Sequence, residues 1–353
     1  MPKISKPVSS ENILLMSIAL LLLLSVVVLR SIASFLFPLY YLYIGISLFV
    51  FFLFSKLDFE VVSLFSKHLY VLSIVFLVLP LLIGQVTRGT VRWIPLGPLS
   101  IQPAEIVRPF LLVFFANYLT KEVLDIKRLA KALLLLFLPL LLILVQPSLG
   151  VTILTALGFF GVLLASGLDK KYLVIGFVII LVALPLAWNI LAPYQRLRLL
   201  SFLNPGEDPL GAGYNSIQSM VSVGSGMLFG RGLGKGVQTQ LAFLPERHTD
   251  FIFASVSEEL GFVGAVIIIL GLFLIFWRLI KIIETARSFP ARAFVAGLFL
   301  ALFIESVIHI GMNLGLLPIT GIPLPLVSAG GSSLLATMIG LGLALGSQKP
   351  NAT

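Results

Sequence analysis

The sequence predicts an all-α, polytopic integral membrane protein with about ten transmembrane helices and one large extracytoplasmic loop. Of its 353 residues, 59% are hydrophobic and only 11% are charged, whereas a soluble domain has about 25% charged residues. Because so few polar side chains cannot cover a water-facing surface, the surrounding solvent must be membrane lipid. Apolar segments near the roughly 20 residues that a spanning helix needs recur along the chain, which we expect to form a single domain over residues 1–353.

Ten apolar segments are the predicted spans. They cover about residues 13–29, 35–54, 69–84, 104–119, 131–146, 148–166, 171–190, 250–277, 292–314 and 326–346. Proline and glycine within several of them are tolerated where neighbouring helices satisfy the freed backbone groups. No small-residue cleavage site follows the first apolar run, which is expected to remain as a signal anchor. The absence of cysteine excludes disulfides and thiolate metal sites.

The basic residues predict the orientation of these spans. With the N-terminus in the cytoplasm, most of the 24 lysines and arginines fall on the inner side, and the short outer connections hold only Arg30, Arg88 and Arg92. This distribution favours cytoplasmic N- and C-termini and an even number of spans. Topology therefore explains most of the net charge of +9, and no nucleic-acid partner is expected.

The outer loop at about residues 191–249 is too polar to span a membrane, and loops of this length are usually functional or disordered. It contains a glycine-dense stretch from Gly224 to Gly236. With the shorter connections, it gathers basic residues on the outer side: Arg88, Arg92, Arg196, Arg198, Arg231, Lys235 and Arg247. Arginine matches phosphate with a bidentate fork, so these residues indicate an anionic substrate, with scattered solvated charge as the alternative.

Asp250 lies where this loop ends and the eighth predicted helix begins. One interpretation is an N-cap, a position that aspartate favours. The other is a catalytic carboxylate at the boundary between membrane and water. The two interpretations are compatible, because a helix N-terminus also stabilises an ionised carboxylate.

Charged residues also lie within the predicted spans, where each costs about 2.5–3.5 kcal/mol at the helix centre. Glu105 and Arg108 share one helix face. Either they form an internal ion pair, or Arg108 reaches a partner on another helix, such as Asp250. Glu258 and Glu259 must face a cavity, pair with a cation or lie near the headgroups, and both structural pairing and direct function are open.

A polar stripe runs along the ninth predicted span. Glu305, His309 and Asn313 recur every four residues on an otherwise apolar helix. A contact with another helix is favoured over the wall of a cavity.

The segment 318–333 is rich in glycine and serine and ends at Ser332 and Ser333. Backbone amides near a helix start can cradle an anion. The same residue types also serve close helix packing, so this signal alone does not decide between the two.

Short strings spread over residues 92–333 carry a resemblance to a known family. They are Arg92-Trp93-Ile94, Gln102-Pro103-Ala104-Glu105, Gln146-Pro147-Ser148-Leu149-Gly150, Asn204-Pro205, Gly213-Tyr214-Asn215, Gly230-Arg231-Gly232-Leu233-Gly234, Leu244-Pro245-Glu246, His248-Thr249-Asp250-Phe251, Glu258-Glu259-Leu260-Gly261, Met312-Asn313, Leu317 to Pro325 and Ser328-Ala329-Gly330-Gly331-Ser332-Ser333. In number and order they resemble the SEDS family (shape, elongation, division and sporulation), which includes RodA and FtsW. Ten spans and a large outer loop are similar to that family too.

The resemblance implies a peptidoglycan glycosyltransferase that polymerises lipid II at the outer face of the bacterial cytoplasmic (inner) membrane, in cell elongation or division. It also implies a class B penicillin-binding protein as partner, and the family's essential aspartate matches Asp250. In the family a lysine stands at the position of Arg108. Ala104, Ser148 and Ala329 replace a serine, an aspartate and a tyrosine of the family.

The expected site combines both lines of reasoning. The candidate catalytic residues are Asp250, Arg108 and Glu105, and the candidate substrate-binding residues are Arg92, Arg196, Arg231, Lys235, Arg247, His248, Glu258, Ser332 and Ser333. A divalent cation, Mg or Mn, is the one cofactor left open, without assigned ligands. The alternatives are a lipid II flippase, with Glu105, Glu258 and Glu305 lining a crossing path, and a scaffold that only recruits a synthase.

Overall fold

The computed structural model describes residues 10–83, 85–87, 90–169, 171–176, 178, 181, 189, 193–211 and 213–348. Its helices are α1 (Ser10–Ile32), α2 (Leu39–Lys56), α3 (Phe59–Leu64), α4 (Ser66–Ile83), α5 (Pro103–Thr120), α6 (Ile126–Val145), α7 (Leu149–Ala165), α9 (Pro193–Leu203), α10 (Tyr214–Ser225), α11 (Val237–Gln240), α12 (Ile252–Thr285), α13 (Phe289–Asn313) and α14 (Gly331–Gly346). A 3-10 turn, η1 (Ser34–Leu36), follows α1, and the short strands are β1 (Gln85–Thr87), β2 (Thr90–Leu96) and β3 (Leu99–Ile101).

The predicted all-α membrane fold is confirmed. Within the described ranges, nine of the ten predicted spans correspond to helices: α1, α2, α4, α5, α6, α7, α12, α13 and α14. Six of these are long and apolar enough to cross a membrane, and α7 and α14 are shorter apolar helices. The predicted span at 171–190 lies largely outside the described residues.

The helices α5 and α13 form the centre of the bundle. Most of their residues are buried. α13 packs against α5, α7 and α12, and α5 also packs against α4 and α14. In contrast, α2, α4 and α6 are only 17%, 22% and 28% buried over their apolar stretches, so most of their apolar side chains face outward, as helices in contact with lipid do.

Small residues let α7 and α13 approach closely. A Cβ at Gly161 would lie 2.8 Å from the carbonyl oxygen of Ala296, and one at Gly297 would lie 2.7 Å from that of Gly158. Because lipid tails are as apolar as the helices, the hydrophobic effect does not drive helices together within a membrane, and they associate through such close backbone packing instead.

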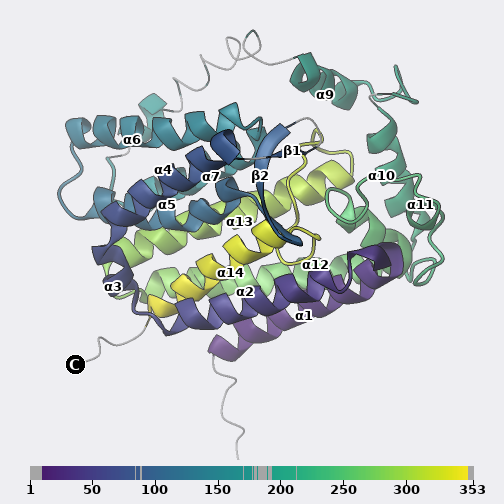
Figure 1. The fold of residues 1–353 in the computed structure, drawn as a ribbon, viewed down its shortest axis with the longest axis horizontal. Coiled ribbons are helices and arrows are strands. Elements are labelled where there is room, and N and C mark those ends of the chain that lie inside the picture. The colour runs from purple at the N-terminus through teal and green to yellow at the C-terminus, as the bar shows by residue number, and fades with distance from the viewer. Residues whose placement is uncertain are drawn as a thin grey trace, which may run out of the picture.

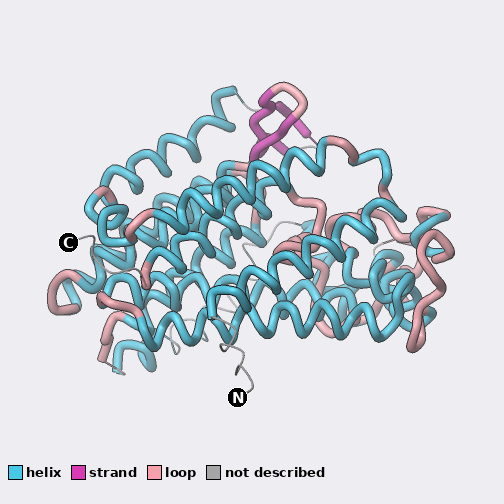
Figure 2. Tube along the Cα trace, turned by 90° about the horizontal axis from the view of Figure 1, so that it is seen from below, coloured by secondary structure: helices cyan, strands magenta, loops and turns pink. Residues whose placement is uncertain are grey.

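The two ends of the bundle differ. Helices α9, α10 and α11 gather at one end, here called the loop end, and α14 runs towards the opposite end (Figure 1). Between α4 and α5, the strands β1, β2 and β3 form a small antiparallel sheet, magenta in Figure 2, which the sequence did not predict. α14 begins at Gly331, later than the predicted 326, because residues 325–329 form turns in which the N–H groups of Val327 and Ser328 donate to the carbonyl of Leu324.

Candidate active site

Asp250 lies half-buried at the loop end, in the turn directly before α12. The N-cap of α12 is Phe251, whose side chain makes no capping hydrogen bond. The first-turn N–H that a cap side chain would bind belongs to Ala254, and it donates to Asn313 Oδ1 at 3.0 Å. The interpretation of Asp250 as the N-cap is therefore wrong, because a residue of α13 caps this helix.

The backbone around Asp250 is held through three consecutive carbonyl groups. The carbonyl of His248 accepts from Ala329 N–H at 2.9 Å, that of Thr249 from the Ser328 hydroxyl at 2.8 Å, and that of Asp250 from Asn313 Nδ2 at 3.0 Å. These donors come from α13 and from the segment before α14. Parts of the chain that are far away in sequence thus fix the direction in which the Asp250 side chain projects from the backbone.

The carboxylate of Asp250 faces the segment 317–330. A Cβ at Gly321 would lie 3.4 Å from Asp250 Oδ2. Gly321 has a φ of +69°, a left-handed conformation that glycine adopts without strain. His309 of α13 anchors the same segment, because its Nδ1 lies 2.7 Å from the carbonyl oxygen of Ile322.

A cluster of buried charges lies farther along the bundle. Arg108 Nη2 of α5 forms an ion pair with Glu305 Oε2 of α13 at 3.0 Å, and the two side chains are 5% and 1% exposed. Glu105 is buried nearby, and the charges of Arg108 and Arg92 both act on it. Arg108 therefore reaches another helix as one interpretation expected, but its partner is Glu305 rather than Asp250. The catalytic roles of Arg108 and Glu105 stay predictions.

The polar stripe of α13 is confirmed as a set of contacts inside the bundle. Glu305 pairs with α5, His309 holds the segment 317–330, and Asn313 holds the start of α12. At 1.5 Å per residue, steps of four residues place Glu305 about 12 Å from Asn313 along the helix. The ion pair and Asp250 therefore lie at two different depths.

α12 is broken at Gly261, and residues 226–234, here called the strap, fill the break. Gly261 has φ +67° and ψ −159°, and a Cβ on it would lie 2.3 Å from the backbone nitrogen of Gly230. The backbone groups that the break frees pair with the strap. Before the break, the carbonyls of Glu258 and Glu259 accept the N–H groups of Arg231 (2.8 Å) and Gly232 (3.0 Å). After it, the N–H groups of Phe262 and Val263 donate to the carbonyls of Met227 (2.8 Å) and Leu228 (3.2 Å). A helix can be interrupted within a membrane only where its backbone groups are satisfied in this way.

The side chains of Glu258 and Glu259 are also bound to the loop. The two oxygens of Glu258 accept the N–H groups of Gln238 and Thr239 at 2.9 Å each. Glu259 Oε1 accepts from the Ser31 hydroxyl, Gly234 N–H and the Gln240 side-chain amide at 2.8, 3.0 and 2.9 Å. This geometry supports structural pairing for both residues, and substrate binding by Glu258 stays a prediction.

The predicted substrate-binding basic residues differ in burial. Arg231 and Lys235 are exposed on the strap and just after it, and Arg196 and Arg247 are half-buried. Arg247 Nε donates to the carbonyl of Ile32 at 3.2 Å, which ties the loop to the end of α1. Their binding roles stay predictions, and Arg88 lies outside the described residues.

His248 and the serines at the start of α14 touch other parts of the bundle. The His248 ring meets Phe35 edge-on, with centroids 5.8 Å apart. Ser332 Oγ accepts the N–H of Gln102 at 2.8 Å, and a Cβ at Gly331 would lie 2.2 Å from the ring of Tyr43. The glycine and serine residues therefore serve close packing here. Anion binding by Ser332 and Ser333, which are both buried, stays a prediction.

A divalent cation finds no ligand set in the described residues. They contain no group of three or more histidine, aspartate or glutamate side chains that could hold a metal ion. The divalent cation therefore stays a prediction without assigned ligands.

Two residues that support Asp250 had no assigned role in the sequence. Asn313 belongs to the polar stripe and to one family-like string, and Ser328 belongs only to a family-like string. A buried polar side chain in an apolar segment signals a hydrogen bond, but the sequence does not reveal which backbone group accepts it.

Together, the fold and the site define a polytopic membrane enzyme with a carboxylate at the loop end and buried charges between its central helices. A family model described as a cell cycle protein, FtsW/RodA/SpoVE, matches residues 10–350. The chain belongs to this family, and it is a glycosyltransferase.

Named relatives and solved structures cover most of the chain. The peptidoglycan glycosyltransferase MrdB of Escherichia coli K12 is 41% identical over 283 residues, which is 79% of this chain and 76% of the relative. Stage V sporulation protein E of Bacillus subtilis is 36% identical over 311 residues, or 86% and 84% of the two chains. A chain from a solved peptidoglycan synthase complex has a TM-score of 0.81 at 32% identity and covers 94% of this chain and 95% of its own. Thermus thermophilus RodA has a TM-score of 0.70 at 29% identity, covering 98% and 97%.

Proposed function

We propose that this chain polymerises lipid II into peptidoglycan glycan strands at the outer face of the bacterial cytoplasmic membrane, with Asp250 as the general base. The observation that carries the proposal is the position of Asp250 at the loop end. Hydrogen bonds hold the backbone carbonyls of residues 248–250, and the carboxylate of Asp250 lies beside Gly321. Cytoplasmic N- and C-termini place this end outside. Relatives named peptidoglycan glycosyltransferases support the reaction class.

The reaction is a glycosyl transfer between two lipid-linked sugars. Asp250 accepts the proton of the acceptor hydroxyl while that oxygen attacks the anomeric carbon of the donor. The bond from the anomeric carbon to the pyrophosphate breaks, and the polyprenyl pyrophosphate leaves with the electron pair, which inverts the anomeric centre. Base catalysis of this kind typically contributes 10²–10⁴-fold.

The basic residues near the loop end stabilise the departing pyrophosphate. Arg231 and Lys235 are exposed and Arg247 is half-buried, so their charges are available to a head group in water. Arginine offers phosphate a bidentate fork, and fixed positive charge lowers the energy of the transition state where negative charge develops. The polyprenyl tail stays in lipid among the apolar helices.

A class B penicillin-binding protein is the proposed partner. A solved chain with a TM-score of 0.81 to this one comes from a peptidoglycan synthase complex. Cross-linking of the new glycan by such a partner would follow directly on its synthesis.

The test compares Asp250→Asn with the unaltered chain, each purified with its penicillin-binding protein and supplied with lipid II. We expect glycan synthesis to fall by about 10²–10⁴-fold, the contribution of the base. The matched control is Asp125→Asn, since Asp125 only caps α6 by accepting Arg128 N–H at 2.8 Å and asparagine is an equally good cap. Normal polymerisation by Asp250→Asn would refute the assignment.

The same assay separates the polymerase from the flippase alternative. In detergent there is no bilayer to cross, so a flippase leaves lipid II unchanged whereas a polymerase makes glycan. Two of the glutamates that a crossing path would use, Glu258 and Glu305, are bound to α11 amides and to Arg108 in the structure, which favours the polymerase.

A further inference from the structure

The first turn of α12 is capped from a different helix. The N-cap residue, Phe251, has no side-chain acceptor, and Asn313 Oδ1 takes the N–H of Ala254 at 3.0 Å. The same amide group donates through Nδ2 to the carbonyl of Asp250 at 3.0 Å. One side chain of α13 therefore binds both Asp250 and the helix that follows it.

Asn313 has no freedom to move independently of these partners. Its side chain and backbone are fully buried. Nδ2 also donates to the carbonyl of His309 at 2.8 Å, and the carbonyl of Asn313 accepts from the Ser219 hydroxyl of α10 at 2.9 Å. A buried polar network with its members satisfied is rigid, so α10, α12 and α13 meet at one fixed point next to Asp250.

Ser328 holds the adjacent residue from the other side. Its hydroxyl donates to the carbonyl of Thr249 at 2.8 Å and accepts the N–H of Leu324 at 2.8 Å. It is 4% exposed. The hydroxyl therefore links the Asp250 turn to the segment 317–330, whose Gly321 faces the carboxylate.

We propose that Asn313 and Ser328 are positioning residues that fix the carboxylate of Asp250 for proton transfer. This inference rests on the proposed role of Asp250 as the base. Both side chains act on the backbone of the Asp250 turn and not on the substrate. Their loss lowers the rate of the chemical step and leaves the binding of lipid II unchanged.

The experiment measures kcat and KM for lipid II in the full chain purified with its penicillin-binding protein. The variants are Asn313→Asp, Asn313→Ala and Ser328→Ala. Asn313→Asp keeps the oxygen that caps α12, where a negative charge suits a helix N-terminus, but it puts an oxygen in place of the donor to the carbonyls of Asp250 and His309. Thermal unfolding of this variant therefore accompanies the kinetics, and Asn313→Ala, which adds no charge, serves as the second variant. Because misplacement by about 1 Å can cost 10²-fold, we expect kcat to fall by up to about that factor, with KM unchanged.

Matched controls remove equivalent hydrogen bonds away from Asp250. Asn117 of α5 donates to Ser63 O and Ser66 Oγ at 3.1 and 2.7 Å, and Ser306 of α13 bonds to its own helix through Leu302 O at 2.9 Å. Asn117→Ala and Ser306→Ala should keep kcat and KM at the unaltered values.

The possible results are separable. Unchanged kcat in both Asn313→Asp and Ser328→Ala, with Asp250→Asn inactive, overturns the positioning role alone. Equal losses of kcat in the control variants also overturn it, because a general loss of structure then explains the effect. Normal activity of Asp250→Asn rejects the base itself, and the positioning role with it.

Discussion

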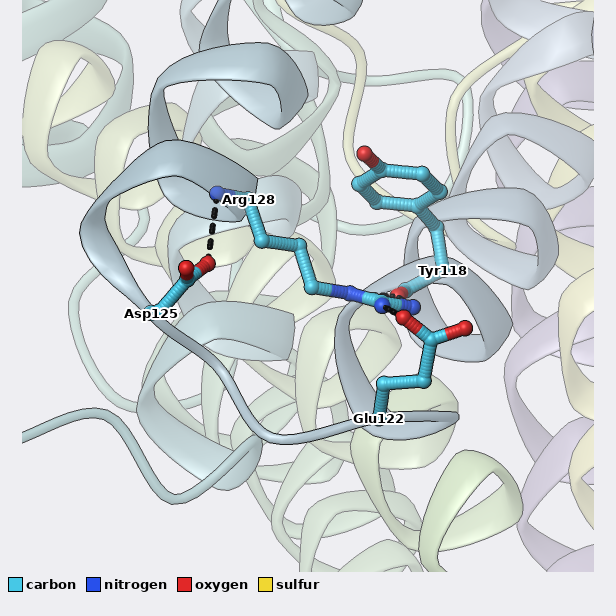
Figure 3. Close-up of polar contacts among 4 residues, drawn as sticks. All are labelled: Tyr118, Glu122, Asp125 and Arg128. Atoms are coloured by element: carbon cyan, nitrogen blue, oxygen red, sulfur yellow. Dashed lines mark hydrogen bonds and ion pairs between the residues drawn. The ribbon is translucent and has the colours of Figure 1, made fainter.

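Two arginine–glutamate pairs lie towards the two ends of α5. They differ in burial and in how many residues separate the partners along the chain. Towards the loop end, Arg108 pairs with Glu305 of α13, and the side chains are 5% and 1% exposed. Beyond the other end, Arg128 of α6 pairs with Glu122, and the side chains are 13% and 70% exposed. Figure 3 shows this corner, where Arg128 also donates through Nε to the carbonyl of Tyr118 at 2.9 Å.

The difference in burial decides what each pair contributes. An exposed pair contributes about 0–1 kcal/mol, because water and salt screen it. Breaking a buried pair costs about 3–5 kcal/mol, because one charge is left without compensation in a medium that does not solvate it. The same two residue types therefore form a local surface contact at one end of α5 and a constraint between two central helices at the other.

The largest effect is expected from Arg108→Leu. Its loss leaves the buried Glu305 without its ion-pair partner and removes the stronger of the two positive charges that act on Glu105, so we expect the free energy of unfolding to fall by about 3–5 kcal/mol. Denaturant-induced unfolding in detergent micelles measures this change.

A second substitution tests whether the uncompensated charge is the cause. Arg108→Leu combined with Glu305→Leu should recover part of the lost stability, since the unpaired Glu305 is then gone and Arg92 still acts on Glu105. If Arg108→Leu costs no more than Arg128→Leu, burial does not distinguish the two pairs.

The loop end also depends on distant backbone contacts, which Gly261→Ala tests. Alanine at φ +67° is strained, and its Cβ would lie 2.3 Å from the backbone nitrogen of Gly230 in the strap. We expect a loss of about 1–3 kcal/mol and faster proteolysis of the strap. The control is Gly45→Ala in α2, where an added Cβ meets nothing within 4 Å. Equal stability of the two variants would show that the strap does not constrain α12.

The contrast between the two ends of α5 also explains how far the sequence could predict the structure. Apolar runs predicted most of the helices, because the length of a span and its apolar composition are local properties. The corner at Arg128 is local too, since Arg128 and Glu122 are six residues apart. The contacts at the site are not local, because Asn313 and Asp250 are 63 residues apart and Ser328 and Thr249 are 79 residues apart.

Pattern alone could therefore identify Asp250 and the stripe of α13 as polar, but not their partners. The stripe shows which residues face inward, whereas the tertiary fold decides that Glu305 meets Arg108 and that Asn313 caps α12. The break in α12 was missed for the same reason, because Gly261 is a single glycine in an apolar run until the strap is placed beside it.

The smallest effect is expected from Glu122→Gln at the corner of Figure 3. Glu122 is 70% exposed, so its removal should change the free energy of unfolding by about 0–1 kcal/mol, and the change should shrink as salt is added. Arg128 keeps the carbonyl and the ring of Tyr118. Asp125→Ala in the same corner should cost more, about 0.5–2 kcal/mol, because it removes the cap of α6. An effect of Glu122→Gln as large as that of Arg108→Leu would mean that exposure does not set the strength of these pairs.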